Sequence, residues 1–470
     1  MSDLTGAITA PADDSSAAVT GKKRLQWSSR MAFILAAAGS AVGLGNIWKF
    51  PYITGENGGG AFVLVYLACI LLIGIPVMMA EIMIGRRAQK NPAEAMQTLA
   101  LEANASRLWK SVGWMGVICG FLILSFYTVI AGWAVSYVFT SASGAFVDIT
   151  PDQAGAMFGG MLADPIRLLS WSTIVVIATM YIVGRGVNAG LEKAVNFMMP
   201  GLLVLILIMV GYAMSTGHFI EGVEFLFAPD FSKLTTESVL VALGHAFFTL
   251  SLASGAIMTY GSYLPRNTSI VKTSIAVGFV DTAVALLAGL AIFPIVFAYG
   301  LEPGAGPGLI FVTLPIAFGQ MPFGIVFGTL FFVMLSIAAL TSAISLIEPA
   351  ISWLTEKRQF SRFKACVTSG LALWTLGLGT VFSFNIWEEH KLFGKTFFDL
   401  IDFLTANLMM PLGGLCVAIF AAWVIKSKVA EEELGLGNSL LYKVWQFAMR
   451  YITPLGIVIV FLNALGVISL

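Results

Sequence analysis

Charge is scarce in this chain. Only 11% of its 470 residues are Asp, Glu, Lys or Arg, whereas a soluble domain usually carries about 25%. Lys plus Arg number 26 and Asp plus Glu number 26, a balance that argues against a basic nucleic-acid-binding protein and an acidic disordered chain. Hydrophobic residues make up 58%, and the mean hydropathy is +0.88. We therefore expect most of the chain to lie in lipid.

Residues that bind metals or form disulfides are also few. The three histidines lie far apart in the sequence. Four cysteines stand singly inside apolar runs, without a CxxC pair: Cys69, Cys119, Cys366 and Cys416. The sequence therefore predicts no zinc site, no disulfide framework and no histidine-based metal enzyme.

Long apolar runs are abundant. A helix that crosses a bilayer needs about 20 mostly apolar residues. Residues 1–24 are rich in Ser, Ala, Asp and Thr and are predicted to be a disordered tail, not a signal peptide, because no apolar stretch precedes Met31. Eleven runs are predicted to span the membrane: 29–52, 60–84, 109–140, 169–184, 192–214, 240–262, 272–299, 323–354, 362–384, 397–425 and 442–468.

The basic residues between these runs predict an orientation. Lys and Arg gather on the cytoplasmic side of membrane proteins. With the N-terminus inside, the inner segments hold 21 Lys and Arg and the outer loops hold 4. The N-terminus is therefore predicted to be cytoplasmic, and an odd number of spans places the C-terminus outside.

The first span contains a glycine-rich segment, Gly39-Ser-Ala-Val-Gly-Leu-Gly-Asn46. Glycines weaken a helix, and an unwound helix exposes carbonyl oxygens. Inside a membrane such backbone is tolerated only where it lines a cavity, so ions or a polar substrate are natural partners. The alternative is close helix packing through small residues, although Asn46 and Lys49 also require polar partners.

The sixth span is interrupted in a similar way by Phe247-Phe-Thr-Leu-Ser-Leu-Ala-Ser-Gly255. If spans 1–5 and 6–10 are repeats, the first and sixth spans correspond. Because five is odd, the second copy is inverted. Interrupted helices at matching positions indicate the binding site of a secondary transporter.

The eighth span adds two adjacent hydroxyls in Ala338-Ala-Leu-Thr-Ser342. Two hydroxyls and backbone oxygens together suit a bare hard cation. The alternative for each hydroxyl is a hydrogen bond to its own helix.

Ionisable residues inside spans are costly and point to function. An unpaired carboxylate at Asp281 would need a cation or a proton. Glu81 and Glu348 are expected to be buried structural hydrogen-bonding groups, and His245 a hydrogen-bonded interior histidine. The ionisable residues within the predicted spans are Lys49, Glu81, Asp281, Glu348 and Asp402.

At these motifs the chain resembles the bacterial neurotransmitter:sodium symporters, the family that includes LeuT. The resemblance implies an all-α membrane protein with a LeuT-type fold: two inverted five-helix repeats, at 25–214 and 240–425, and an eleventh transmembrane helix at 442–470. The matching motifs are Gly43-Leu-Gly-Asn-Ile-Trp-Lys-Phe-Pro-Tyr52, Glu56-Asn-Gly-Gly-Gly-Ala-Phe62, Phe248-Thr-Leu-Ser251, Leu340-Thr-Ser342 and Met449-Arg-Tyr-Ile-Thr-Pro454.

The resemblance also implies two sodium sites and no organic cofactor. Both sets of ligands are oxygens, as hard cations prefer. The first site would use Ala41, Asn46, Thr249 and Asp281, completed by the carboxylate of the substrate. The second site would use the carbonyls of Gly39, Val42 and Ala338 and the hydroxyls of Thr341 and Ser342.

The substrate pocket follows from the same resemblance. Tyr127 would hydrogen-bond the substrate carboxylate and stack on Phe248. Gly43 leaves room for that carboxylate where monoamine transporters carry aspartate, which favours an amino acid as substrate. The implied pocket residues are Ser40, Ala41, Leu44, Gly45, Ile123, Tyr127, Phe248, Thr249, Ser251, Ser254, Ser342 and Leu346.

Chloride is expected to be unnecessary. Asp281 stands where many relatives have asparagine, and its carboxylate would supply the negative charge that chloride provides in chloride-dependent members. Tyr66 matches the chloride-site tyrosine, but His245 replaces the usual glutamine.

Two ion pairs are expected to act as gates. Lys49 with Asp402 would close the outer side, with lysine as a point charge where relatives usually carry arginine. Arg24 with Glu356 would close the inner side; the alternative for Arg24 is a topology signal. Gly190 and Pro200 enclose nine residues, a spacing that resembles the segment that unwinds in relatives to admit water.

Together these features predict a protein of the bacterial inner membrane that is not an enzyme. Its function would be sodium-coupled import of a neutral amino acid by alternating access, with the lipid bilayer, sodium and the amino acid as partners and no nucleic acid. The alternative is a sodium-dependent amino-acid sensor on a transporter fold.

Overall fold

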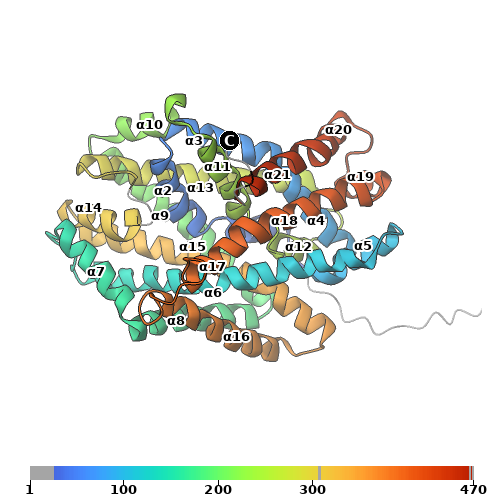
Figure 1. Ribbon diagram of the computed structural model, residues 1–470, viewed down its shortest axis with the longest axis horizontal. Coiled ribbons are helices and arrows are strands. Elements are labelled where there is room, and N and C mark those ends of the chain that lie inside the picture. Colours follow the sequence, from blue (N-terminus) through green and yellow to red (C-terminus); the bar gives the residue numbers. More distant parts are fainter. Residues whose placement is uncertain (1–25, 305–307, 465–466, 468–470) are drawn as a thin grey trace, which may run out of the picture.

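The protein is a bundle of helices (Figure 1). The computed structural model describes residues 26–304, 308–464 and 467. Within them, the strand-like structure is an isolated β-bridge between Leu392 and Lys395. Short π- or 3₁₀-helical segments, labelled η, interrupt or extend the α-helices.

The helices of the first half lie between Arg30 and Lys233. They are α1 (Arg30–Ala41), η1 (Gly45–Lys49), α2 (Phe50–Glu56), α3 (Gly60–Cys69), η2 (Ile70–Gly74), α4 (Ile75–Ala88), α5 (Pro92–Glu102), η3 (Arg107–Trp109), α6 (Lys110–Ala142), α7 (Pro151–Ala163), α8 (Pro165–Gly184), η4 (Val187–Glu192), α9 (Lys193–Met214), α10 (Phe219–Phe227) and η5 (Phe231–Lys233).

The helices of the second half repeat this alternation of long spans and short connecting helices. They are α11 (Thr236–Thr249), α12 (Ala256–Ser262), α13 (Ile270–Ala298), η6 (Leu309–Thr313), α14 (Leu314–Gln320), α15 (Gly324–Lys357), α16 (Arg362–Ser383), α17 (Phe397–Asp402), η7 (Phe403–Met409), α18 (Met410–Ile419), η8 (Phe420–Val424), α19 (Ser427–Leu434), α20 (Leu440–Phe447), η9 (Ala448–Ile452) and α21 (Thr453–Ala464).

Each of the eleven predicted spans is mainly helical in the residues that the structure describes. In the described residues, eight helices are long and apolar enough to cross a membrane, or nine when the bent pair Arg30–Ala41 and Gly45–Glu56 is taken as one span. The other two are the sixth span, where α11 and α12 have only 14 and 7 residues, and the last span, α20 to α21. The sequence analysis did not predict the short connecting helices α5, α7, α10, α14 and α19, because they are too short to span a bilayer.

The first break lies where the glycine-rich segment predicted it. α1 ends at Ala41, and η1 begins at Gly45 after a bend of 48°. The backbone N–H of Val42 still donates to the carbonyl of Ala38 (2.6 Å), while that of Gly43 donates to the side-chain oxygen of Asn46 (3.0 Å). A side chain thus satisfies a backbone group that an unbroken helix would satisfy itself.

The second break spans residues 250–255, between α11 and α12. Its backbone is left-handed at Ser251 (φ +53°), Ala253 (φ +59°) and Gly255 (φ +76°). Two of these three residues carry a Cβ, for which this conformation costs free energy. Glu81 stabilises the segment, because its carboxylate accepts a hydrogen bond from the N–H of Ala253 (2.6 Å).

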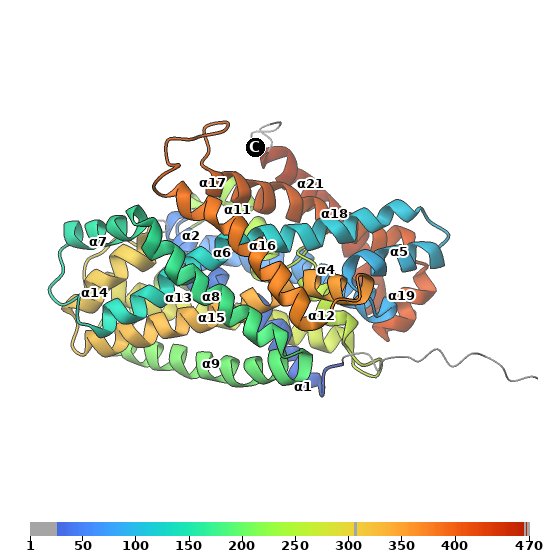
Figure 2. The ribbon, with the colours of Figure 1, turned by 90° about the horizontal axis from the view of Figure 1, so that it is seen from below.

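The two longest helices, α6 and α15, pack against each other in the middle of the bundle. α8 and α16 pack together outside them, as Figures 1 and 2 both show. α1 lies between α13 and α15, which puts its break in the interior.

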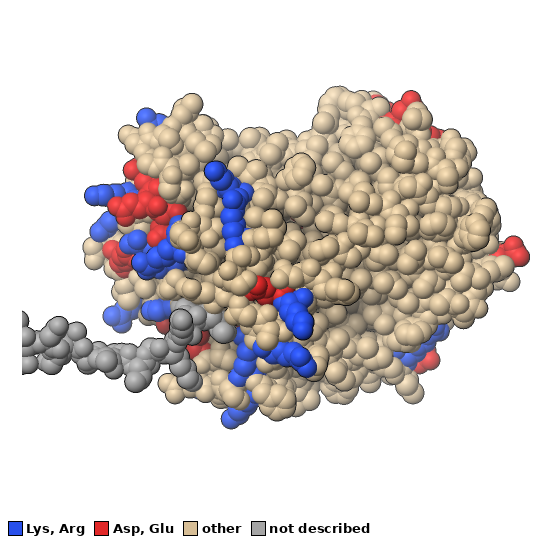
Figure 3. Space-filling view, turned by 180° about the vertical axis from the view of Figure 1, so that it is seen from behind, with Lys and Arg blue, Asp and Glu red and all other residues tan. Residues whose placement is uncertain are grey.

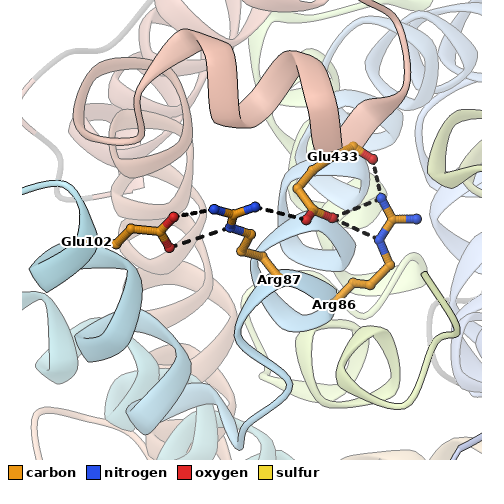
Figure 4. A network of polar contacts seen from close by, with 4 residues as sticks. All are labelled: Arg86, Arg87, Glu102 and Glu433. Carbon is orange, nitrogen blue, oxygen red and sulfur yellow. Dashed lines mark hydrogen bonds and ion pairs between the residues drawn. The ribbon is translucent and has the colours of Figure 1, made fainter. Parts of the chain in front are cut away.

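A charged network holds together one end of the bundle (Figure 4). Arg86, at the end of α4, forms an ion pair with Glu433 of α19 (2.9 Å) and donates to the carbonyl of Thr268 (2.5 Å). Arg87 forms ion pairs with the same Glu433 (3.4 Å) and with Glu102 of α5. The network therefore ties three helices and the loop that follows α12.

Candidate functional site

A central cavity of about 360 Å³ lies where the two breaks meet. It lies mostly within the predicted pocket: ten of the twelve predicted pocket residues line it. Leu44 and Thr249 are buried beside it, and Gly43 and Met410 also line it. The lining residues are Ser40, Ala41, Gly43, Gly45, Ile123, Tyr127, Phe248, Ser251, Ser254, Ser342, Leu346 and Met410.

Gly43 gives two hydroxyl groups access to the first break. A Cβ at this position would lie 2.3 Å from Ser342 Oγ and 2.7 Å from the Tyr127 hydroxyl oxygen. The Tyr127 hydroxyl accepts a hydrogen bond from the N–H of Leu44 (3.2 Å) and keeps its own proton to donate. Beside the break, the cavity is therefore offered a hydroxyl donor.

A second, larger cavity of about 1,440 Å³ lies beside the first. Phe248 and Met410 line both cavities, so these two side chains separate them. Met410 was not among the predicted pocket residues, because no motif in the tenth span marks it. Tyr127 and Phe248 both line the central cavity, but within the described residues the Phe248 ring faces the Lys49 ammonium and has no ring contact with Tyr127, so the predicted stacking is absent from this structure.

Asn46, Thr249 and Asp281 come together as predicted. The Asn46 amide donates to the Asp281 carboxylate (2.8 Å) and to its carbonyl (2.9 Å), and the Thr249 hydroxyl donates to the same carboxylate oxygen (3.0 Å). The Tyr66 hydroxyl lies 3.4 Å from the other carboxylate oxygen. All four side chains are buried, and within the described part of the chain Asp281 has no basic partner within 4.0 Å. A buried carboxylate of this kind requires a cation or a proton.

Six oxygens gather between the first break and α15, namely the five that the resemblance implies and the carbonyl of Ser40. The Thr341 hydroxyl lies 2.9 Å from the carbonyl of Ala338 and 3.5 Å from that of Val42. The Ser342 hydroxyl lies 3.4 Å from the carbonyl of Gly39 and 3.1 Å from that of Ser40. This group carries no formal charge and consists of the ligand type that hard monovalent and divalent cations prefer.

The outer ion pair is not formed in this structure. The Lys49 ammonium lies over the ring of Phe248, 4.6 Å from its centroid, and among the described residues no ion pair joins it to Asp402. Tyr52 lies close enough to interact electrostatically with both Lys49 and Asp402. Lys49 thus covers the aromatic ring that separates the two cavities.

Of the predicted inner ion pair between Arg24 and Glu356, the structure describes only Glu356, because Arg24 lies outside the described residues. Glu356 accepts hydrogen bonds from the backbone and the side chain of Asn91 (2.8 and 2.9 Å). Nearby, the indole of Trp27 donates to the carbonyl of Tyr260 (3.1 Å) and packs edge-on against its ring. The segment that precedes α1 is therefore closed against α12.

The segment before α9 is wound rather than unwound. Residues Val187–Glu192 form the π-helix η4, and a Cβ at Gly190 would lie 2.1 Å from the carbonyl of Ile182. The backbone N–H of Ser28 donates to the Glu192 carboxylate (3.1 Å), and its hydroxyl also bonds this group. Glu192, which no sequence motif marks, therefore holds the N-terminal segment against this turn.

The remaining ionisable residues divide into two kinds. Glu348 forms an ion pair with Arg362 (2.6 Å) and accepts from Tyr263 (2.9 Å), and Glu81 supports the second break; both are hydrogen-bonded as expected. The expectation for His245 is wrong. Within the described residues neither ring nitrogen has a hydrogen-bond partner, because the rings of Phe50 and Tyr66 pack against the imidazole.

Comparisons with known proteins agree with this architecture. The family described as "Sodium:neurotransmitter symporter family" matches residues 24–148 and 157–469. The sodium-dependent transporter YhdH of Bacillus subtilis is 41% identical over 456 residues, which cover 95% of this chain and 99% of YhdH. A sodium-dependent transporter of Haemophilus influenzae is 36% identical, over 94% of this chain and 99% of its own length.

The solved structures include a similar fold. The crystal structure of MhsT in complex with L-phenylalanine has a TM-score of 0.87 and 44% identity, and covers 94% of this chain and 100% of that chain. This similarity confirms the predicted all-α, LeuT-type fold.

Proposed function

The chain belongs to the sodium:neurotransmitter symporter family and is a sodium-dependent symporter, and on that premise we propose that it imports a neutral amino acid with two sodium ions and without chloride. We place it in a bacterial inner membrane, with the N-terminus in the cytoplasm and the C-terminus outside. The observation that carries the proposal is the meeting of two helix breaks and two oxygen clusters at one cavity.

The ends of the broken helices suit the two charges of an amino acid. Backbone N–H groups at the start of η1 and the Tyr127 hydroxyl favour a carboxylate. The C-terminal end of α11, which closes with Phe248 and Thr249, carries the opposite partial charge and favours an ammonium group. Gly43 supports this orientation, because any side chain there would occupy the space before Tyr127.

The rest of the cavity favours an uncharged side chain. Among the described residues no charged side chain lines it, and much of its wall is Ile123, Phe248, Leu346 and Met410. MhsT, which has a similar fold, was crystallised with L-phenylalanine. L-Phenylalanine is therefore the first substrate to test.

The two oxygen clusters are the proposed sodium sites. The first would place sodium between Asn46, Thr249 and Asp281, beside the carbonyl of Ala41 and the substrate carboxylate. The second would place it between Thr341, Ser342 and three backbone carbonyls. Because Asp281 brings its own negative charge to the first site, a chloride ion is unnecessary there.

Two sodium ions would supply enough free energy for accumulation. One charge moving through 100 mV releases about 2.3 kcal/mol, and two release about 4.6 kcal/mol. At about 1.4 kcal/mol per factor of ten, a neutral substrate would be concentrated about 10³-fold.

Alternating access would use the closures described above. The side chains of Phe248 and Met410 separate the central cavity from the larger cavity, which we assign to the outer side. On the inner side, the contacts of Trp27 with Tyr260 and of Ser28 with Glu192 must break before substrate leaves.

The test is uptake into liposomes that contain the purified protein. An inward sodium gradient should drive saturable accumulation of labelled L-phenylalanine or another neutral amino acid, equally in chloride and gluconate. Sodium-dependent binding without accumulation would instead identify a sensor, and the absence of both would refute the proposed substrate class.

A further inference from the structure

A long groove lies between α8 and α16, away from the central cavity. Its empty volume is about 1,390 Å³, and its lining runs from Thr173 on α8 to Arg185, the residue after that helix, and from Phe363 to Trp374 on α16. Most of its lining is apolar and open to the surroundings; Phe363 is 76% exposed and Leu371 is 64% exposed. In a membrane, lipid must meet this surface.

Hydrogen bonds fix both ends of the groove. At one end the Trp374 indole donates to the Thr173 hydroxyl (2.9 Å). At the other, Arg362 donates to the carbonyl of Val183 (2.7 Å) while it forms its ion pair with Glu348 (2.6 Å). Hydrogen bonds thus join the two helices at both ends of the groove. The groove between them is therefore a fixed feature of the surface.

Small residues give the groove its depth. A Cβ at Gly370 would lie 3.0 Å from the side chain of Met180, and a Cβ at Gly184 would lie 3.8 Å from the Cys366 sulfur. Larger side chains at these two positions would reduce the space between the helices.

The groove has the length of one membrane leaflet. On α8 it extends from Thr173 to Gly184, which at a rise of about 1.5 Å per residue is about 17 Å. Half of the hydrocarbon core of a bilayer is about 15 Å thick. One acyl chain of one leaflet therefore matches the groove from interface to midplane.

Positive charge borders only one end. Arg185 lines the groove there, and Lys364 follows Phe363 on α16; both side chains are exposed. They lie over the rings of Tyr181 and Phe360, and neither has an acidic partner within 4.0 Å in the described ranges. Glu348 does not compete for them, because Arg362 neutralises it.

This end is the side that we assign to the cytoplasm. Asn188, three residues after Arg185, donates to the carbonyl of Gln26 (3.0 Å), so Arg185 lies near the N-terminal segment. In Figure 3 the charged side chains of the face shown gather mainly at its left end.

We propose that the groove binds one anionic phospholipid of the inner leaflet, with an acyl chain between α8 and α16 and the phosphate between Arg185 and Lys364. Basic pockets between transmembrane helices on the cytoplasmic side are suited to anionic headgroups. The proposal depends on the orientation in the membrane and is independent of which amino acid is transported.

The test compares two lipids that differ only in headgroup charge. The delipidated full chain in an uncharged detergent is titrated with phosphatidylglycerol or with phosphatidylcholine of the same acyl chains, and retained lipid is counted by native mass spectrometry. Phosphatidylglycerol should occupy one saturable site. Arg185→Gln with Lys364→Gln should weaken its binding at least about tenfold, whereas the exposed pair Lys426→Gln with Lys428→Gln should leave it unchanged.

A second variant tests the acyl chain. Leu371→Trp fills the groove without touching a basic residue and should also weaken phosphatidylglycerol, while glycerol phosphate, which has no chain, should bind neither protein. Equal binding of the two phospholipids, or full binding by the double glutamine variant, would overturn the proposal. So would a stable dimer that crosslinks through Val367→Cys and ignores added lipid, because a second copy would then cover the groove.

Discussion

At the scale of single residues, hydroxyl groups and one glycine define the site. Thr341 and Ser342 bring two side-chain oxygens to four carbonyls, and Gly43 keeps the space before Tyr127 empty. None of these residues is chemically unusual. Their position beside broken helices makes them specific.

Removing both hydroxyls of the second oxygen cluster should abolish coupling. A contact to a charged group contributes about 1.5–3 kcal/mol, so Thr341→Val with Ser342→Ala should weaken sodium binding by about 10²- to 10⁴-fold. Uptake into liposomes and sodium-dependent melting measure this. Thr329→Val is the control on the same helix, since its hydroxyl bonds only the carbonyl of Ile325 (2.6 Å); normal uptake by the double variant would remove this cluster from the mechanism.

A methyl group at Gly43 should block the amino acid. Its carbon would lie 2.3 Å from Ser342 Oγ, and relief of such overpacking costs about 1–3 kcal/mol. Gly43→Ala should therefore lose stabilisation by L-phenylalanine in sodium. Gly201→Ala on α9, where the added carbon meets open space, should keep it. If both variants respond alike, the carboxylate lies elsewhere.

At the scale of elements, the broken helices depend on neighbouring helices. The left-handed residues Ser251 and Ala253 are held by the carboxylate of Glu81 on α4 and by the carbonyl of Ser40, which accepts from the Ser251 hydroxyl (2.8 Å). α4 thus acts as an external cap for a break in another span.

Glu81→Ala should release that break. The N–H of Ala253 would lose its acceptor, which costs about 1–3 kcal/mol of unfolding free energy, and substrate affinity should fall with it. Glu81→Gln keeps an acceptor oxygen and should retain most of the unfolding free energy and most of the substrate affinity. Chemical denaturation and ligand-dependent melting distinguish the variants, and equal behaviour of alanine and glutamine would show that the hydrogen bond is unimportant.

The sequence predicted the spans and breaks well because apolar length and glycine spacing are local signals. It also brought Asn46, Thr249 and Asp281 to one place, through the resemblance. It missed Met410 and Glu192, whose roles arise from packing between distant segments. His245 was expected to find a hydrogen-bond partner, but the aromatic rings that pack against it are not adjacent in sequence.

At the scale of the whole molecule, one side of the bundle is closed by contacts of the N-terminal segment. Ser28 bonds Glu192 before α9, and Trp27 bonds and packs against Tyr260 on α12. The larger cavity lies on the other side of Phe248 and Met410. The structure therefore corresponds to a state that is shut toward its N-terminal end.

Breaking the tie at Glu192 should favour opening at that end. Hydrogen bonds to a carboxylate contribute about 1.5–3 kcal/mol, so Glu192→Ala should raise the population of the open state by about tenfold or more. The labelling rate of a cysteine at buried Val187, in a chain without its four native cysteines, measures this. If the labelling rate is the same in Glu192→Ala as with native Glu192, the contact between Ser28 and Glu192 has a purely structural role.

The orientation itself can be tested with reporters. We expect alkaline phosphatase fused after the eleventh span to be active, because the enzyme folds only outside the cytoplasm. The same reporter fused within the segment 426–439 should be inactive. The reverse pattern would invert the assignment of inner and outer sides and would refute the proposed direction of import.

The carbonyl of Ser40 links the two proposed binding regions. It accepts from Ser342 of one oxygen cluster (3.1 Å) and from Ser251 of the second break (2.8 Å). An ion that orders Ser342 therefore also orders the wall of the amino-acid cavity. Because such coupling is reciprocal, the factor by which sodium tightens the amino acid must equal the factor by which the amino acid tightens sodium. The four dissociation constants form a closed thermodynamic cycle, in which any three determine the fourth.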